Sequence, residues 1–292
     1  MRNCIFVTGA SGKLGQAVVE ELVAHDYEVV GADRRPPPVR RPEVRFAEIE
    51  LGDVGQVAGA MSGAQAVIHL GAIPGPGRHA DEVVFGNNTR ATFAVLQAAR
   101  LLGVRKAVIA SSISALGPSF SPEPTTPLYA PVDEEHPLLG ADPYALSKEV
   151  DERTAAMFHR RVGIAVAALR FSFIGTAHEV AESAARLQLN PAAGSRTLWS
   201  YIDIRDAAAA TRLAVDAAGL TFDVFNVTAA DTLSDIPTEK LLREYAPSVE
   251  IRQRILAHAS AYSIEKARLL GYEPAHSWRD KSAARRAAPA AQ

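Results

Sequence analysis

VTGASGKLG, residues 7–15, places three glycines three residues apart, between an apolar run and a stretch with helical periodicity. At Gly9, Gly12 and Gly15, glycine permits a tight turn, lets backbone N–H groups approach a pyrophosphate and allows the next helix to pack closely on the strand. The helix N-terminus then favours negative charge. A lone glycine triplet also occurs in ordinary turns, but here an acidic residue, Asp33, ends the next apolar run. The pattern therefore predicts a dinucleotide site.

The region after this loop is built from alternating elements. Short apolar runs rich in Val and Ile alternate with stretches of helical periodicity along residues 3–171. This alternation predicts an α/β fold of the Rossmann type, a doubly wound parallel sheet with helices on both faces. Strands are expected at 3–8, 27–33, 44–49, 66–70, 106–111 and 164–171, and helices at 13–25, about 80–102 and 143–161.

The chain is expected to have two parts and a tail. Residues 1–175 are interpreted as the dinucleotide-binding domain, 176–280 as a small C-terminal α/β substrate-binding appendage with some return to the sheet, and 281–292 as a flexible tail. The appendage is expected to contain strands at 199–202 and 222–227 and helices near 204–217, 234–245 and 262–270. The long irregular segment 117–137 is predicted to lie over a site.

Composition limits the function classes. The chain has 292 residues, 48% of them hydrophobic, and a formal net charge of −2. These values exclude a disordered chain and a basic nucleic-acid binder. Cys4 is the single cysteine, so no intrachain disulfide forms, which is typical of the reducing cytoplasm. No apolar run approaches the roughly 20 residues of a membrane span. We expect a cytoplasmic protein with a small-molecule substrate and with no nucleic-acid partner, membrane partner or metal site.

Two acidic residues bear on the cofactor. Asp33 can accept hydrogen bonds from a ribose diol and would repel a 2′-phosphate, which favours NAD. Arg34 and Arg35 follow it and can attract that phosphate or lie in a solvated loop, so NADP stays open. Asp53, after the third predicted strand, either caps the next helix or receives an adenine amino group.

A tyrosine and a lysine suggest proton transfer. Tyr144 and Lys148 lie four residues apart on a predicted helix, which places both side chains on one face. An ammonium beside a phenol favours the phenolate, which a tyrosine general base needs near neutral pH, although most such pairs only cover a helix surface. Ser111 and Ser112 follow the fifth predicted strand, where a hydroxyl can polarise a substrate oxygen or simply form a turn.

The motifs TGASGKLG, ELGDV, HLGA, NNTRAT, SSISALG and YALSK occur together in one order along the chain. In this order and spacing, the chain resembles the extended short-chain dehydrogenase/reductase family, the NAD-dependent epimerase/dehydratases, over about residues 3–175. The resemblance continues weakly through YIDIRDAA and SIEKARLLGYEP. It implies hydride transfer between a secondary alcohol carbon and the nicotinamide of NAD, with NADP as the alternative.

The resemblance also implies roles for individual residues. Tyr144 would be the general acid/base and would also bind the cofactor, and Lys148 would be its activator and a ligand of the nicotinamide ribose. Ser112 would be the hydroxyl that orients and polarises the substrate. Asp53 and Val54 would contact the adenine. The remaining cofactor-binding residues that the resemblance implies are Gly9, Gly12, Lys13, Leu14, Gly15, Asp33, Arg34, Leu70, Gly71, Ala72 and Asn88, with Asn88 steadying the sheet, while His69 is expected to pack rather than catalyse.

The substrate-binding part departs from the nucleotide-sugar enzymes of this family. A short segment separates Gly175 from the DIRD stretch at 203–206, so much of the usual wall for a sugar nucleotide is missing. Ile-Ser follows Ser112, where dehydratases carry Asp-Glu, which argues against dehydration. The compact C-terminal part is similar to that of uronate dehydrogenases, which oxidise a free sugar acid. The candidate substrate residues are Pro74, Ile113 and Arg186, and an exposed helix position explains Arg186 equally well.

Three functions follow from these observations. The first is an NAD-dependent dehydrogenase that acts on a small sugar-like or other secondary alcohol. The second is an epimerase that retains NAD and returns the hydride to the opposite face. The third is a non-catalytic nucleotide sensor, which the presence of Ser112, Tyr144 and Lys148 argues against. A homodimer through the helices near 80–102 and 143–161 is also expected, with packing onto the sheet as the alternative.

Overall fold

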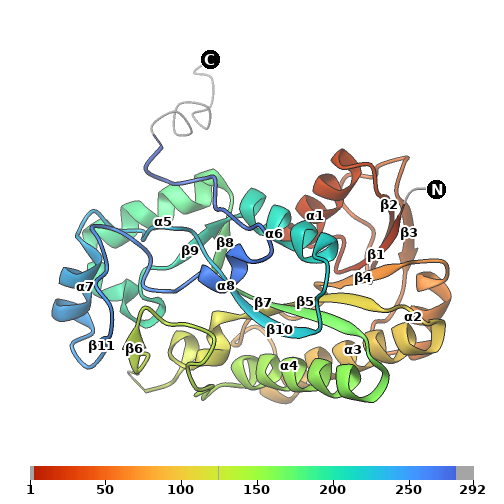
Figure 1. The fold of residues 1–292 in the computed structure, drawn as a ribbon, viewed down its shortest axis with the longest axis horizontal. Helices are drawn as coiled ribbons and strands as arrows, with labels where there is room; N and C mark the ends of the chain where they lie inside the picture. Colours follow the sequence, from red (N-terminus) through yellow and green to blue (C-terminus); the bar gives the residue numbers. More distant parts are fainter. Residues whose placement is uncertain (1–2, 124, 281–292) are drawn as a thin grey trace.

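Parallel strands form the centre of the molecule (Figure 1). The computed structural model describes residues 3–123 and 125–280, and within them seven strands pair in the order β10-β7-β5-β4-β1-β2-β3. The order reverses between β1 and β4, which makes the sheet doubly wound and confirms the Rossmann-type fold. These strands are β1 (Cys4–Thr8), β2 (Glu28–Asp33), β3 (Arg45–Glu48), β4 (Ala66–His69), β5 (Lys106–Ser112), β7 (Ala165–Phe171) and β10 (Phe222–Val227).

Helices cover both faces of this sheet. Figure 1 shows α1 and α6 above it and α2, α3 and α4 below it. Ile5 and Val7 of β1 pack in the core on the α1 and α6 side, while Phe6 between them packs on the other side. A strand buried on both faces must be apolar throughout, which explains the continuous apolar runs. The helices are α1 (Lys13–Ala24), α2 (Val54–Met61), α3 (Asp81–Leu102), α4 (Pro143–Val162) and α6 (Ile204–Asp216).

The predicted elements of the first part agree with the structure within one residue at each end.

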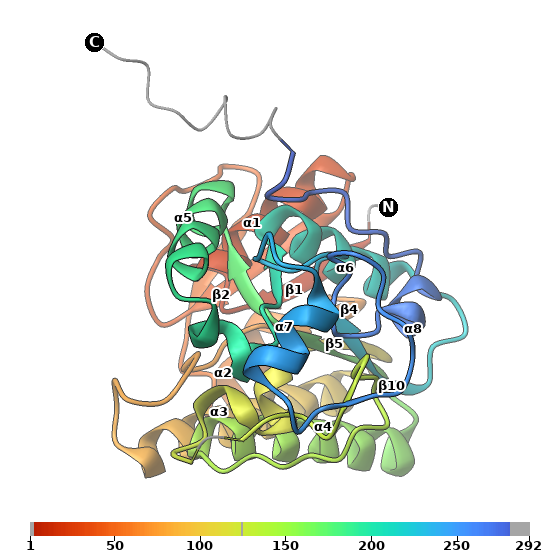
Figure 2. The ribbon, with the colours of Figure 1, turned by 90° about the vertical axis from the view of Figure 1, so that its left-hand side faces the viewer.

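The second part gathers beyond the carboxyl ends of the sheet, where Figure 2 shows α5 and α7 toward the viewer. It contains two small parallel pairs, β8 with β9 and β6 with β11. Its elements are α5 (Ala177–Leu189), β9 (Tyr201–Asp203), α7 (Thr238–Tyr245), β11 (Glu250–Ile251) and α8 (Glu265–Arg268). The first part of the chain supplies the partners of its two strands, β6 (Tyr129–Ala130) and β8 (Phe173–Gly175).

One strand that the sequence assigned to the appendage belongs to the main sheet. Residues 222–227 form β10, which pairs with β7 over its whole length, and α6 packs beside α1. Phe225 and Val227 enter the core on one face, while Phe222 and Val224 pack on the other. A strand with apolar residues on both faces needs cover on both sides, which the main sheet provides. The division of the chain at residue 175 stays a prediction.

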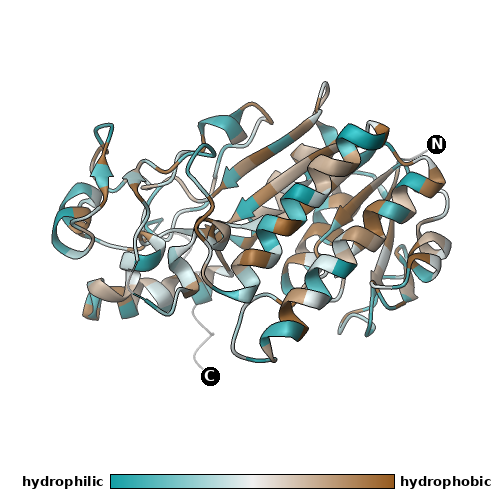
Figure 3. Ribbon diagram, turned by 90° about the horizontal axis from the view of Figure 1, so that it is seen from below, coloured by the Kyte–Doolittle hydropathy of each residue, from teal (hydrophilic) through white to brown (hydrophobic). Residues whose placement is uncertain are grey.

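The helices carry hydrophilic and hydrophobic residues interleaved along their lengths, as the view from below shows (Figure 3). None of the helices in the described part combines the length and the hydropathy that a membrane span requires.

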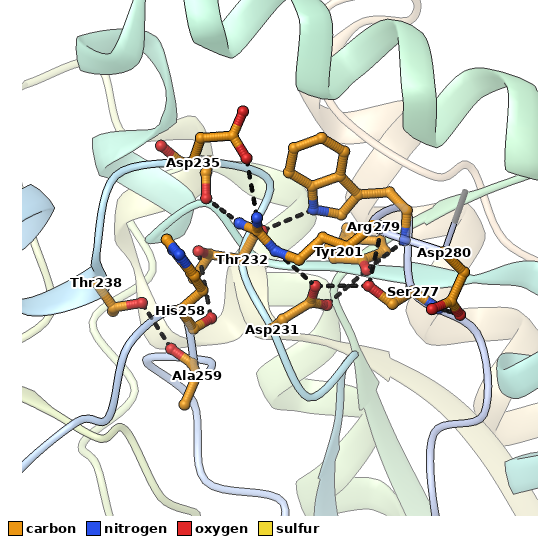
Figure 4. Close-up of polar contacts among 12 residues, drawn as sticks. Tyr201, Asp231, Thr232, Asp235, Thr238, His258, Ala259, Ser277, Arg279 and Asp280 are labelled. Atoms are coloured by element: carbon orange, nitrogen blue, oxygen red, sulfur yellow. Dashed lines mark hydrogen bonds and ion pairs between the residues drawn. The ribbon is translucent and has the colours of Figure 1, made fainter. Parts of the chain in front are cut away.

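The described chain ends in a segment that is tied to the second part (Figure 4). Ser277 Oγ donates a hydrogen bond to Asp231 Oδ2 (2.7 Å), and the Tyr201 hydroxyl donates to the other oxygen of the same carboxylate (2.6 Å). The Arg279 guanidinium donates to Asp235 (2.9 Å). These contacts hold the last described residues against β9 and the segment 231–235. The predicted tail, 281–292, lies outside the described residues.

Candidate active site

A cleft of about 620 Å³ opens where the glycine loop meets the carboxyl ends of β4, β5 and β7. It is the place where most of the predicted site residues come together. A second cleft, of about 960 Å³, lies between α1 and the segment 36–48 and contains none of them. The predicted residues that line the first cleft are Gly9, Gly12, Lys13, Leu14, Gly15, Leu70, Ala72, Pro74, Ser112, Ile113, Tyr144 and Lys148.

The glycine loop has no room for side chains. Gly9 has a φ of +68°, and a Cβ on it would lie 2.6 Å from the amide nitrogen of Gly71. A Cβ on Gly15 would lie 2.0 Å from the carbonyl oxygen of Gly9. Gly12 is the N-cap of α1, which no side chain caps, so the first N–H groups of the helix are free to bind an anion. This cradle fits the pyrophosphate of a dinucleotide.

Asp33 ties the glycine loop to the end of β2. Its Oδ2 accepts a hydrogen bond from the Ser11 amide (3.1 Å), and its Oδ1 accepts one from the Arg34 amide (2.7 Å). The Ser11 hydroxyl donates in turn to the carbonyl of Arg35 (2.6 Å). Asp33 and Arg34 therefore lie beside the loop, although neither lines the cleft.

Asp53 caps α2, as one of its two predicted roles requires. Its Oδ1 accepts hydrogen bonds from the amides of Gly55 (2.8 Å) and Gln56 (3.1 Å). The bond from the Gln56 amide, together with the others around the carboxylate, lowers the pKa of Asp53. Val54 is the first residue of this helix. The contact of Asp53 and Val54 with an adenine stays a prediction.

Tyr144 and Lys148 are held by the start of α4. Pro143 begins the helix, and Asp142 caps it by accepting hydrogen bonds from the amides of Tyr144 and Ala145 (both 2.9 Å). The ammonium of Lys148 lies 5.8 Å from the centre of the Tyr144 ring. The predicted pair therefore shares one face of the helix and one cleft.

The Lys148 ammonium has two further partners. It donates to the Ala110 carbonyl oxygen (2.8 Å) at the end of β5 and lies 3.4 Å from the Asp151 carboxylate. Burial raises the pKa of Asp151 despite the adjacent Lys148 ammonium. These contacts fix Lys148 against the strand rather than leaving it on the helix surface.

The two serines were predicted to follow the strand, but they are the last two residues of β5, and their surroundings differ. Ser111 donates a hydrogen bond to the Glu152 carboxylate (2.6 Å), which also forms a two-point ion pair with Arg170 (both contacts 2.8 Å). Ser112 caps the short 3₁₀ turn that follows, and its hydroxyl meets Ser114 Oγ (3.1 Å). Ser111 is thus engaged in a buried network, and Ser112 is the serine whose hydroxyl can turn toward a ligand.

Asn88 joins two walls of the cleft without lining it. Its side chain accepts a hydrogen bond from the Ile73 amide (2.8 Å) and donates to the Ile73 carbonyl oxygen and to Ser147 Oγ (both 3.1 Å). The connection after β4 and the helix α4 are therefore held in register. Gly71 lies in the same connection, against the glycine loop.

The structure does not bring Arg186 to the cleft. Arg186 is exposed on α5, and its guanidinium donates to Ser183 Oγ (2.8 Å) one turn away. The arginine that lines the cleft is Arg78, in the connection between β4 and α3. The sequence analysis did not select Arg78. Its place could have indicated it, because Arg78 follows HLGAIPGPG, a connection from a strand end, and such connections face the ligand crevice.

A comparison with protein families identifies the family of the chain. The model of the "NAD dependent epimerase/dehydratase family" matches residues 5–228. The chain belongs to this family. The match covers the glycine loop, the segment 110–120 and α4, and the family's dependence on NAD agrees with the cofactor that the sequence predicted.

Curated relatives match the chain in part. It is 31% identical over 175 residues to a putative UDP-glucose 4-epimerase of Methanocaldococcus jannaschii, covering 58% of this chain and 55% of the relative. It is 30% identical over 169 residues to a uronate dehydrogenase of Pseudomonas putida, covering 58% and 60%. The chain thus spans between half and two thirds of the length of these relatives.

A solved structure matches nearly the whole chain. A short-chain dehydrogenase/reductase superfamily protein from Agrobacterium tumefaciens, crystallised with bound NAD, is 26% identical, with a TM-score of 0.73 and coverage of 97% of both chains.

His69, at the end of β4, is buried below the cleft. Its Nδ1 lies 2.7 Å from Thr8 Oγ1 and its Nε2 lies 3.2 Å from Thr92 Oγ1. Burial, and secondarily the charge of Lys148, lowers the pKa of His69 to about 3. The neutral ring therefore holds β1, β4 and α3 together, which agrees with the expected packing role.

This burial predicts a pH-dependent stability. Between about pH 6.5 and 3, the unfolded chain takes a proton on His69 that the folded chain refuses, so stability falls as the pH falls, by up to about 1.4 kcal/mol per pH unit. Urea denaturation between pH 4.5 and 7.5 should show a shallower slope for His69→Gln than for the unaltered protein. His178→Gln, at an exposed position on α5, should keep the original slope. An unchanged slope in His69→Gln contradicts the assignment.

Proposed function

We propose that this protein is an NAD-dependent oxidoreductase that transfers a hydride at a secondary alcohol of a small sugar-like substrate, with Tyr144 as general acid/base. The observation that carries the proposal is the meeting of Ser112, Tyr144 and Lys148 in one cleft with the glycine loop. Each of these residues has a common structural explanation when taken alone, but a helix surface pair and a turn serine would have no reason to share a cleft with an uncapped helix N-terminus.

The chain's own groups would hold the cofactor. The uncapped amides of α1 and the side chain of Lys13 suit the pyrophosphate, and Asp33 suits the adenosine ribose. Lys148 would bind the nicotinamide ribose. When bound, NAD supplies the acceptor for the hydride that leaves the substrate carbon. We assign to the binding of NAD the further residues Gly9, Gly12, Leu14, Gly15, Arg34, Asp53, Val54, Leu70, Gly71 and Ala72. Asn88 steadies the connection after β4 beside them.

Tyr144 takes the proton of the substrate hydroxyl in the oxidation. Tyr144 receives this proton as the phenolate and becomes the neutral phenol, and the nearby Lys148 ammonium stabilises the phenolate before the transfer. Ser112, whose hydroxyl can rotate away from Ser114, donates a hydrogen bond to the substrate oxygen and fixes its direction. In the reverse direction the same phenol returns the proton to the carbonyl oxygen.

Epimerisation with a retained cofactor is the second candidate. Lys13 Nζ donates to the Ile174 carbonyl oxygen (2.8 Å) and lies 3.0 Å from the Glu179 carboxylate, so it joins the glycine loop to the opposite wall of the cleft. A bridge of this kind favours slow cofactor release. Nucleotide analysis of the purified protein separates the candidates, since an epimerase carries NAD through purification and accumulates no NADH with substrate.

Tyr144→Phe tests the mechanism. Removal of the phenol hydroxyl should lower turnover by about 10²- to 10⁴-fold, because general acid/base catalysis contributes about that much. NAD affinity, measured by calorimetry, should change far less than turnover, since the glycine loop and Lys148 are intact. Tyr245→Phe, outside the cleft, is the matched control and should keep full turnover. Full turnover in Tyr144→Phe would refute the assigned role.

We also propose that two copies associate through α3 and α4. Phe93 and Leu101 of α3 are 45% and 59% exposed, and Leu146 of α4 is 46% exposed. Burying such side chains against a second copy removes apolar surface from water. Light scattering should give twice the chain mass, and Leu101→Glu with Leu146→Glu should give the monomer. Leu189→Glu, on exposed α5, should leave the mass unchanged. A monomeric mass for the unaltered protein would contradict the proposal.

A further inference from the structure

The charges that line the cleft are of one sign. Among the described residues that line it, Lys13, Arg78 and Lys148 are cations, and none is an aspartate or a glutamate. Lys13 has Glu179 as a partner, and Lys148 has Asp151. Arg78 is an exposed residue at the rim of the cleft and has no hydrogen-bond or ion-pair partner within the described part of the chain. The cleft therefore presents one guanidinium whose charge no protein group neutralises.

We propose that Arg78 binds an anionic group of the substrate, so that the substrate is a small hydroxylated carboxylate or phosphate ester rather than a neutral alcohol. This inference rests on the proposed function, because it names the substrate class of the same site. A guanidinium is suited to either anion, since its fork of N–H donors matches two oxygens at once.

The connection that carries Arg78 begins near the Tyr144 ring. It passes beside Phe120, because a Cβ built on Gly75 would lie 3.7 Å from the edge of the Phe120 ring. The Phe120 ring in turn meets the Tyr144 ring edge-on, with 6.0 Å between the centres. The connection that carries Arg78 therefore passes beside the Phe120 and Tyr144 rings, whereas the uncapped amides of α1 belong to the glycine loop.

The cleft also has an unsatisfied hydroxyl. Ser172, directly after β7, lines the cleft, and its Oγ is buried without a hydrogen-bond partner in the described structure. A buried hydroxyl without a partner is destabilising, and a ligand hydroxyl can supply the missing hydrogen bond. The hydroxyls of Ser114, Ser119 and Thr197 line the same cleft. Arg78 and this polar lining together suit a polyhydroxylated anion.

The volume limits the size of this anion. A cleft of about 620 Å³ that also receives part of a dinucleotide leaves space for a small molecule. A free sugar acid or a sugar phosphate fits this limit better than a sugar that carries its own nucleotide.

Matched substrates test the proposal. We would measure kcat and KM with NAD for a free aldose, its uronic acid and its 6-phosphate, using NADH absorbance. At least one anion should be preferred to the neutral aldose, and the comparison of the two anions identifies carboxylate or phosphate as the group recognised. In Arg78→Ala, KM for the preferred anion should rise about 10- to 100-fold with kcat nearly unchanged, because a charged hydrogen bond made in ground state and transition state alike is lost.

Three control variants sharpen this result. Arg78→Lys should recover part of the affinity, and Arg78→Gln repeats the charge loss with less change in side-chain volume. Arg254→Ala, at an exposed loop arginine that does not line the cleft, should leave both constants unchanged. Equal kcat/KM values for the neutral and the anionic substrates would overturn the proposal. An equal effect of Arg78→Ala on KM for the neutral and the anionic substrates would overturn it too. If Arg78→Ala weakens NAD binding and leaves the anion selectivity unchanged, Arg78 binds the cofactor and the proposal is wrong.

A binding measurement separates this proposal from the proposed function. If no substrate yields NADH, calorimetry of the NAD-loaded protein with the uronic acid, the sugar phosphate and the aldose still tests Arg78. Anion-selective binding that Arg78→Ala abolishes would support the anion site while refuting the dehydrogenase reaction. Equal or absent binding of all three compounds would overturn the anion site.

Discussion

Backbone packed directly against backbone, where the first turn of α1 meets the ends of β1 and β4, is the constraint on which the rest of this structure depends. A side chain on Gly9 would collide with Gly71, and one on Gly15 would collide with Gly9. Because no side chain separates them, the start of α1 comes close to the ends of two central strands. Its uncapped amides therefore face the same cleft as the groups that follow β4, β5 and β7.

Buried charge forms a second level of organisation. The Glu152 carboxylate holds Arg170 and Ser111 in the interior, next to the Lys148 ammonium with its own carboxylate partner, Asp151. Removing one member of a buried pair leaves the other uncompensated, which is costly, so such networks hold their members in one geometry. Here that geometry fixes Lys148 beside the Tyr144 ring and leaves Ser112 as the serine with a hydroxyl that can turn.

The site could be predicted only in part from sequence, for reasons that individual residues show. Local spacing is enough to find the residues at strand ends and on one helix face. The three glycines and Ser112 lie at or after a strand end, and Tyr144 and Lys148 share one helix face. Arg78 lies in an irregular connection, where no periodicity indicates which way a side chain points. Arg186 shows the converse, because a cation at a suitable distance along the sequence lies on α5 and does not line the cleft. The sequence likewise could not show that Lys13 meets Glu179, 166 positions later.

The sequence by itself determined the six strands of the main sheet that lie within residues 3–171 and the helices α1, α3 and α4. Each is a regular element with one or both faces apolar, and glycine, proline or an N-cap residue such as Asp142 marks its ends. The two-residue strand β6, inside a segment that was expected to be irregular, was not predicted. Only the tertiary structure decided that residues 222–227 join the main sheet. It also decided that Ser111 is engaged with Glu152, and that Arg78 is the cleft arginine without a protein partner in the described residues. The physical reason is range. Periodicity and capping act over a few residues, whereas strand pairing, ion pairing and the lining of a cleft depend on groups that come together only when distant segments pack.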